Sequence, residues 1–247
     1  MDVSIITPVY NEEDNIQPFF KELCQVIDSQ NYETEIIAVD DGSDDSSPEK
    51  LEQEAFRNDI VKVISLKENH GQSKALQAGI DRSKGETVVT IDSDMQNDPR
   101  DIPLIIKELD KTDRDAISGL RDERKDPVRK KFLSAVASKM RKIMFENDIR
   151  DYGCTLKAFD RKAVEALSLH DGMHRYIPVL LEKEGLGISE VEVNHRERNA
   201  GKSKYGLRRL PKGFVDMIDL WIDKKFGRNI LPGSMRKTDY RIEKVIE

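Results

Sequence analysis

Short apolar runs alternate with helix-spaced apolar positions through the first half of the chain. Five runs rich in β-branched and aliphatic residues predict strands, at 3–9, 35–39, 60–66, 87–91 and 115–119. Apolar positions recur at helical spacing between these runs and predict helices at 15–29, after Ser47-Pro48, at 72–83 and at 101–109. Strands that alternate with helices in this way predict an α/β fold, with a mostly parallel sheet flanked by helices.

The pattern changes after Gly119. It predicts helices at 128–145, 161–168 and 175–184, a strand at 188–193, a polar glycine-containing loop at 196–206 and an amphipathic helix at 208–226. The remaining residues are polar, and we expect them to form a loosely attached tail. The organisation predicted is one α/β domain over 1–210, an interface helix over 211–226 and a polar tail over 227–247.

The last predicted helix has an unusual distribution of side chains. Asp216, Asp219 and Asp223 form one narrow stripe, while apolar residues that include Trp221 fill most of the remaining circumference. Half of this apolar surface could pack on the sheet. The excess, with basic residues at both ends of the helix, predicts a membrane-interface helix or a subunit contact.

Polar residues follow three of the predicted strands at the point where each ends. These segments are Pro8-Val9-Tyr10-Asn11, Asp40-Asp41-Gly42-Ser43 and the stretch from Asp92 to Gln96. Ligands of parallel sheets bind beyond the carboxyl ends of the strands, so the agreement of these segments predicts a single site.

The stretch Asp92-Ser93-Asp94-Met95-Gln96 places two carboxylates and an amide at every second position. If the strand continues that far, the three side chains share one face. Hard oxygen ligands suit Mg²⁺ or Mn²⁺, which usually complete their coordination with substrate phosphates. The alternative is a helix cap or an Asx turn, because Asp is common where strands end.

Charge divides the chain into two unlike halves. Residues 1–118 carry 12 Lys and Arg against 27 Asp and Glu, whereas residues 119–247 carry 29 against 20. The basic residues gather in two segments, 121–131 and 198–204, which are either solvated faces or sites for a diphosphate, a lipid phosphate or an acidic membrane surface.

Three other features of the sequence indicate where in the cell the protein is located. No run approaches the roughly 20 apolar residues of a membrane span. The first residues lack the features of a signal peptide. Cys24 and Cys154 do not suggest a disulfide framework, and we therefore expect a cytoplasmic protein.

Six motifs together resemble the family 2 glycosyltransferases, and more closely their polyprenyl-phosphate branch, which is dolichyl-phosphate mannose synthase-like. The resemblance runs from about Val3 to Leu210. The motifs are Thr7-Pro8-Val9-Tyr10-Asn11-Glu12, Val39-Asp40-Asp41-Gly42-Ser43, Asn69-His70-Gly71-Gln72, Asp92-Ser93-Asp94-Met95-Gln96-Asn97, Asp151-Tyr152-Gly153-Cys154 and Arg198-Asn199-Ala200-Gly201-Lys202-Ser203-Lys204-Tyr205.

The resemblance implies a GT-A fold, a divalent metal (Mg²⁺ or Mn²⁺) and inverting transfer of a hexose from a GDP- or UDP-linked donor to a polyprenyl or dolichyl phosphate. It also implies roles for individual residues. Donor-binding residues would be Pro8, Tyr10, Glu12, Asp40, Asn69, Gly71 and Asp92, with Ser203 and Lys204 closing over the phosphates. Metal-binding residues would be Asp92, Asp94 and Gln96. The acceptor phosphate would be held by Arg121, Arg129 and Lys131. Catalysis would depend most on Asp94, Arg121 and Arg198.

A phosphate acceptor explains why no obvious general base accompanies these motifs, since a phosphomonoester oxygen is already anionic near neutral pH. We expect a cytoplasmic enzyme peripheral to the membrane, which contacts the membrane directly or through a separate membrane subunit. We expect no nucleic-acid partner, and the enzyme could form a homo-oligomer. The alternatives are a soluble family 2 transferase that modifies a glycan or protein, a nucleotidyltransferase, and a binding module without activity.

Overall fold

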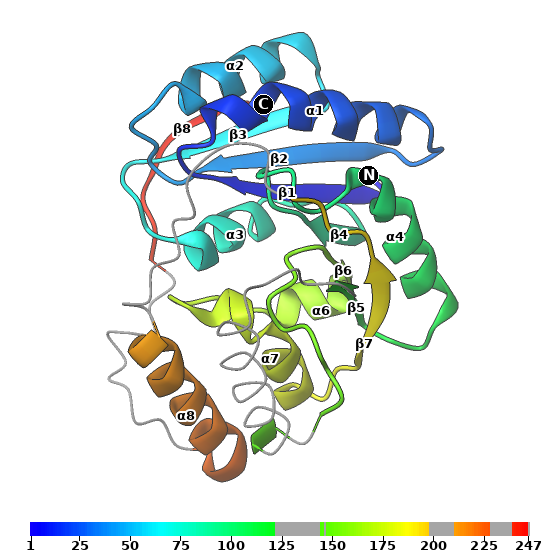
Figure 1. Cartoon of the computed structure of the whole chain (residues 1–247), viewed down its shortest axis with the longest axis vertical. Helices are drawn as coiled ribbons and strands as arrows, with labels where there is room; N and C mark the ends of the chain where they lie inside the picture. Colours follow the sequence, from blue (N-terminus) through cyan, green and yellow to red (C-terminus); the bar gives the residue numbers. More distant parts are fainter. Residues whose placement is uncertain (122–143, 146, 198–209, 228–238, 247) are drawn as a thin grey trace.

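The computed structural model describes residues 1–121, 144–145, 147–197, 210–227 and 239–246, and the side chains of 210–214 are not described. The described strands form one sheet in the order β7-β5-β6-β4-β1-β2-β3-β8 (Figure 1). Their bounds are β1 Val3–Val9, β2 Thr34–Asp40, β3 Val61–Leu66, β4 Thr87–Thr90, β5 Ala116–Arg121, β6 Lys157–Asp160, β7 Ile188–Val193 and β8 Ile242–Ile246. The helices are α1 Glu13–Asp28, α2 Ser47–Arg57, α3 Gln72–Ile80, α4 Ile102–Lys111, α6 Arg161–Ala166, α7 Ile177–Lys183 and α8 Leu210–Phe226, with 3-10 turns η1 Pro99–Asp101 and η2 Met173–Arg175.

The sheet is mostly parallel, as predicted. Strands β1 to β5 and β7 run in one direction, while β6 and β8 run against their neighbours. The sequence pattern indicated neither of these two antiparallel strands. The helix predicted at 128–145 lies almost wholly outside the described residues.

Each face of the sheet is covered by its own helices. Ile5, Ile36 and Val89 pack with α1, α2 and α4, whereas their chain neighbours face the opposite side and pack with α3, α6, α7 and α8 (Figure 1). This period of two is expected where successive side chains of a strand point to opposite faces. Because both faces are buried, the strands read as continuous apolar runs.

The end of the chain is better attached than we expected. β8 pairs with β3, the Tyr240 hydroxyl donates to Asp81 at 2.6 Å, and Lys244 lies 2.7 Å from Glu52 on α2. The prediction of a loosely attached tail is therefore wrong for residues 239–246. The polar composition of these residues did not indicate a strand, because a strand at the edge of a sheet needs only part of its surface buried.

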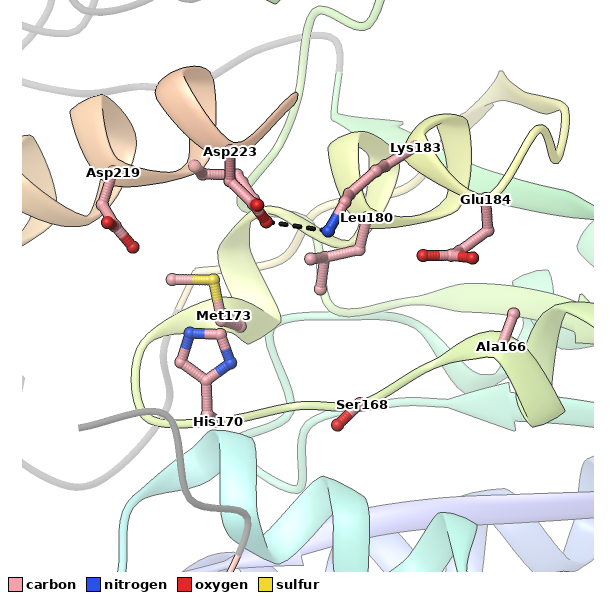
Figure 2. Close-up of a pocket in the computed structure, with 10 residues that line it drawn as sticks. Ala166, Ser168, His170, Met173, Leu180, Lys183, Glu184, Asp219 and Asp223 are labelled. Carbon is pink, nitrogen blue, oxygen red and sulfur yellow. Dashed lines mark hydrogen bonds and ion pairs between the residues drawn. The ribbon is translucent and has the colours of Figure 1, made fainter. Parts of the chain in front are cut away.

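The predicted last helix forms as α8, but its acidic stripe faces inward. Asp216, Asp219 and Asp223 are all buried, and Asp223 lies 2.8 Å from Lys183 of α7 (Figure 2). Val215 and Phe226, by contrast, are 47% and 58% exposed. Across the described part of the chain, no helix has both the length and the apolar character needed to span a bilayer.

A cavity of about 180 Å³ lies between α7, α8 and the segment around His170 (Figure 2). Met173 and Leu220 line it together with charged side chains, including the pair Lys183 and Asp223. None of its lining residues belongs to the strand-end segments that the sequence singled out.

Candidate functional site

The candidate site lies along the edge of the sheet where the parallel strands end. Four segments reach it after β1, β2, β3 and β4, and Arg121 is the last residue of β5. Because β6 is antiparallel and its first residue, Lys157, pairs with Thr90, the loop before β6 also lies at this edge. The fold thus brings the first five motifs, up to Asp151-Tyr152-Gly153-Cys154, to one side of the molecule.

The acidic segment after β4 is a turn rather than an extension of the strand. β4 ends at Thr90, Met95 has a φ of +64°, and the Asp94 carboxylate accepts a hydrogen bond from the backbone N–H of Gln96 at 3.1 Å. The expectation that an extended strand aligns the three side chains is therefore wrong, and the Asx turn forms instead.

Asp92 and Asp94 nevertheless interact electrostatically. Burial raises the pKa of Asp92 above its ordinary value, and the charge of Asp94 raises it further. Arg121 lowers the pKa of Asp92 and Glu12 raises it, so both lie within electrostatic reach of this carboxylate. A cation placed here would offset the repulsion between the two aspartates.

A neutral side chain holds Asp92 in place. The Gln72 amide, in the first turn of α3, donates to Asp92 Oδ1 at 2.7 Å. Thr155, in the loop before β6, lowers the pKa of Asp92 and so lies near the same carboxylate. The β4, α3 and β6 segments therefore come together around Asp92.

The donor set fits a divalent cation that also binds a diphosphate. Asp92 and Asp94 supply carboxylates and Gln96 an amide, while no cluster of three or more His, Cys, Asp or Glu side chains suited to a metal occurs among the described residues. Mg²⁺ characteristically binds through one or two carboxylates and completes its coordination with water and substrate phosphates.

The two aspartates after β2 have different partners. Asp41 accepts backbone hydrogen bonds from His70 at 2.7 Å and Gly71 at 2.8 Å, and burial raises its pKa to about 6. Asp40 is also buried and accepts from the Ser43 amide at 3.2 Å. Asp41 thus ties the β2 loop to the β3–α3 loop, which leaves Asp40 as the candidate for contact with a ligand.

Glycine is required where these two loops cross. Gly42 has a φ of +68°, and a Cβ on it would lie 2.4 Å from the carbonyl carbon of Glu68. Gly71 has a φ of +89° and more open surroundings, and Asn69 is exposed. The backbone of the two loops therefore packs directly together, as few residues other than glycine allow.

The segment after β1 has a rigid base. The Glu12 carboxylate is buried and accepts from Asn15 Nδ2 at 2.6 Å, while its amide donates to the Ser47 hydroxyl at 2.9 Å. Pro8 and Tyr10 are partly buried beside it. These contacts attach the predicted nucleoside-binding segment to α1 and α2.

Arg121 is paired more tightly than its predicted role suggested. Its Nε and Nη2 donate to the two oxygens of Asp151 at 2.6 and 2.9 Å, and the side chains are 13% and 8% exposed. The Glu190 carboxylate in turn accepts from the backbone amides of Arg150 and Asp151. Within the described part of the chain, Arg121 Nη1 makes no hydrogen bond and can serve a ligand.

The segment after β7 is fixed to the acidic turn. Arg196 pairs with Asp98 and Glu22 at 2.7 Å each, its amide donates to the Gln96 carbonyl at 2.8 Å, and Asn194 donates twice to Asp101. Arg129, Lys131, Arg198, Ser203 and Lys204, to which the resemblance assigned roles, lie outside the described residues.

Four residues of the site were not among those predicted. Gln72 and Asp151 each stand inside a quoted motif, so their positions carried a signal, and Asp41 adjoins a predicted residue. Thr155 carried none, because only the antiparallel insertion of β6 brings it to Asp92.

A mostly parallel sheet with acidic, glycine-containing loops at its carboxyl edge is typical of nucleotide-binding α/β proteins. Within that class, residues 4–168 match the profile of glycosyl transferase family 2, and the chain belongs to this family. The family membership and the GT-A fold expected from the resemblance are both confirmed.

Two curated relatives have similar sequences. Dodecaprenyl-phosphate galacturonate synthase of Rhizobium johnstonii is 32% identical over 89% of this chain. Undecaprenyl-phosphate 4-deoxy-4-formamido-L-arabinose transferase of Edwardsiella ictaluri is 33% identical over 87% of this chain. The aligned part makes up 66% of each relative, so the chain spans slightly less than two thirds of their length.

Solved structures show the same fold at low sequence identity. Glucosyl-3-phosphoglycerate synthase of Mycobacterium tuberculosis, in complex with Mn²⁺, UDP-glucose and phosphoglyceric acid, has a TM-score of 0.69 at 17% identity, covering 90% of this chain and 79% of its own. A mannosyltransferase of Pyrobaculum calidifontis, in complex with GDP-mannose and Mn²⁺, has a TM-score of 0.61 at 19% identity, covering 95% and 66%.

Proposed function

We propose that this protein is an inverting glycosyltransferase that moves a hexose from a GDP- or UDP-linked donor to a polyprenyl phosphate. The names of the two curated relatives, which pair dodecaprenyl-phosphate or undecaprenyl-phosphate with a sugar, support this proposal. The family membership supports the use of a nucleotide-sugar donor.

The pairing of Arg121 with Asp151 is the observation that favours a phosphate acceptor. Asp151 is the carboxylate nearest to Arg121, and both of its oxygens accept hydrogen bonds from the guanidinium. A hydroxyl acceptor needs a general base, and a carboxylate held in this way is a poor one. An anionic phosphate acceptor needs a positively charged partner instead of a base. The Arg121 guanidinium is positively charged, and its Nη1 is available to donate to the phosphate.

The mechanism follows from where the charges lie. Arg121 orients the acceptor phosphate so that its oxygen lies behind the anomeric carbon, which removes much of the entropic cost of the reaction. We assign Asp40 and Glu12 to contact with the nucleoside. A divalent cation bound by Asp92, Asp94 and Gln96 would neutralise charge that develops on the departing nucleoside diphosphate. We assign Arg198, Ser203 and Lys204 to the same diphosphate, and Arg129 and Lys131 to the acceptor phosphate.

We further propose that α8 contacts the cytoplasmic face of the membrane that holds the acceptor. Its acidic stripe faces the protein, while Val215 and Phe226 are exposed and Lys225 lies 5.2 Å from the Trp221 ring. Exposed apolar side chains beside lysines suit an interface rich in anionic lipid. Loss of vesicle binding in Val215→Asp, with the fold intact, would support this contact.

The decisive experiment offers the protein UDP- and GDP-sugars, Mn²⁺ or Mg²⁺, and a short polyprenyl phosphate. We expect a glycosyl phospholipid and a nucleoside diphosphate. Transfer to a glycan or peptide would establish the soluble-transferase alternative, and release of pyrophosphate would indicate a nucleotidyltransferase. Failure to form a lipid product with any donor would contradict the proposal.

A matched pair of variants tests the acidic turn in the same assay. Asp94→Ala should abolish transfer while the protein stays folded. Asp110→Ala removes an exposed carboxylate from α4 and should leave transfer unchanged. Full activity in Asp94→Ala would contradict its assignment as a metal ligand.

A further inference from the structure

Four neighbouring strands carry polar side chains at one level of the sheet. In register from β4 through β6 and β5 to β7, these residues are Thr90, Lys157, Ser118 and Glu190. Residues paired in register point to the same face of a sheet, so the four side chains form a row across it. We refer to them as the polar row.

Glu190 holds the beginning of the loop that precedes β6. Its Oε2 accepts from the backbone N–H of Arg150 at 2.8 Å, and its Oε1 accepts from the backbone N–H of Asp151 at 2.7 Å. Hydrogen bonds from a backbone N–H to a carboxylate are stronger than those to a neutral acceptor. One side chain of β7 therefore fixes two consecutive peptide groups of this loop.

Lys157 and Thr90 hold the end of the same loop. Lys157 Nζ donates to the carbonyl of Cys154, and the Thr90 hydroxyl donates to the carbonyl of Thr155 at 2.7 Å. Lys157 is 1% exposed, and a lysine is rarely buried so deeply unless its ammonium group is paired. Replacing buried charged groups with apolar residues of similar size is often neutral or stabilising, so stability alone does not account for a lysine here.

The loop held by the polar row carries the partner of Arg121. The Asp151 carboxylate accepts from Arg121 Nε at 2.6 Å and Nη2 at 2.9 Å, and from the backbone N–H of Gly153 at 3.1 Å. Glu190 thus fixes the main chain of Asp151, and the side chain of Asp151 fixes the guanidinium. A displacement of this loop would change the direction in which Arg121 Nη1 points.

We propose that Glu190 and Lys157 position Arg121 for the acceptor phosphate, because they fix the loop that carries Asp151. Neither residue touches the substrate in this scheme, so both are positioning residues. The inference rests on the proposed function, since it assumes that Arg121 binds the acceptor phosphate. It adds two residues that belong to none of the sequence motifs and to neither basic segment.

Glu190→Gln is the direct test, because glutamine keeps the shape of glutamate and has one oxygen for the two backbone N–H groups. The KM for a short polyprenyl phosphate and the KM for the nucleotide-sugar are measured on the same protein. We expect the first to rise about 10-fold, as for one buried donor left unpaired, and the second to stay within about 2-fold. The control is Glu192→Gln, which alters an exposed carboxylate two residues further along β7 and should leave both values unchanged.

A double variant shows whether Glu190 acts through Asp151. If it does, Glu190→Gln should add little to a protein in which Asp151→Asn already disturbs Arg121. We expect the KM for polyprenyl phosphate in the double variant to be within about 2-fold of that in Asp151→Asn alone, because effects within one hydrogen-bonded series are not additive. Single effects that multiply, or equal rises in KM for both substrates, would show a merely structural effect and overturn the proposal.

Lys157→Met tests the other end of the loop and keeps the proposal testable if Glu190→Gln does not fold. It should also raise the KM for polyprenyl phosphate selectively. An unchanged value in either folded variant, where Arg121→Met raises it, would overturn the inference alone. An unchanged KM for polyprenyl phosphate in Arg121→Met itself would contradict the proposed function of Arg121.

Discussion

Replacing Asp151 with asparagine should separate the electrostatic role of this residue from its shape. The carboxylate accepts from Arg121 Nε and Nη2 at 2.6 and 2.9 Å, and from the Gly153 amide at 3.1 Å. Asparagine keeps one oxygen for these donors, but its own amide group would then face the guanidinium. The variant therefore leaves a buried arginine without its counter-charge.

The expected magnitude follows from burial. Arg121 is 13% exposed and Asp151 is 8% exposed. Removing one partner of a buried pair typically costs about 3–5 kcal/mol, whereas an exposed pair is worth roughly 0–1 kcal/mol. We expect Asp151→Asn to lose about 3 kcal/mol of unfolding free energy, at the lower end because the pair reaches solvent at the site.

Urea unfolding at pH 7 measures this loss. The control is Glu52→Gln, which breaks the exposed pair with Lys244 and should cost less than about 1 kcal/mol. The double variant Arg121→Met with Asp151→Asn contains no unpaired buried charge. It should therefore be about 2 kcal/mol more stable than Asp151→Asn alone.

Acceptor kinetics give a second measurement. Because Asp151 sets the direction of the Arg121 guanidinium, we expect a raised KM for polyprenyl phosphate and an unchanged KM for the nucleotide-sugar. A stability loss no larger than that of Glu52→Gln, or a double variant no more stable than the single, would refute the reasoning from burial.

Three further outcomes are expected. Burial raises the pKa of Asp41 to about 6, so the folded state favours the protonated carboxyl and becomes less stable as the pH rises and this proton is lost. Between pH 4 and pH 7, the unfolding free energy of the wild type should therefore fall by up to about 3 kcal/mol relative to that of Asp41→Asn, as measured by denaturant unfolding. Parallel pH profiles of the two proteins would contradict this. Gly42→Ala should cost more than Gly185→Ala in the same measurement, because both glycines have positive φ but only Gly42 meets backbone within 3 Å. Tyr240→Phe should lower the unfolding free energy by about 1–2 kcal/mol, since its hydroxyl donates to Asp81, and no change would show that this hydrogen bond does not stabilise the fold.

The sequence pattern was sufficient for the strands that are buried on both faces. β1, β2 and β3 are long apolar runs, and their bounds differ from the predicted ones by a residue or less. β6 was missed because it has four residues and begins with Lys157, which is 1% exposed and donates to the Cys154 carbonyl. A buried lysine does not fit an apolar pattern. Strand β6 forms because it pairs with both β4 and β5.

The candidate site was also only partly predictable from the sequence. The sequence singled out Asp92 and Asp94 because they follow a predicted strand, and Arg121 through a basic cluster and the family resemblance. It did not indicate the partner of Arg121, since Asp151 reaches the site from a loop far along the chain. The condition for aligning Asp92, Asp94 and Gln96 on one face of a strand is not met, because β4 ends at Thr90 and an Asx turn follows it.

Three carboxylates at this edge of the sheet have different hydrogen-bond partners, and the partner of each indicates its role. Asp151 faces a guanidinium, so its charge is used in directing Arg121. Asp41 accepts from two backbone amides and so joins two loops, while burial raises its pKa to about 6. Asp92 accepts from the neutral side chain of Gln72 and lies beside the like charge of Asp94. Of the three, Asp92 is therefore the carboxylate that we propose binds a cation, and Arg121 Nη1 is the donor that we propose binds an anion.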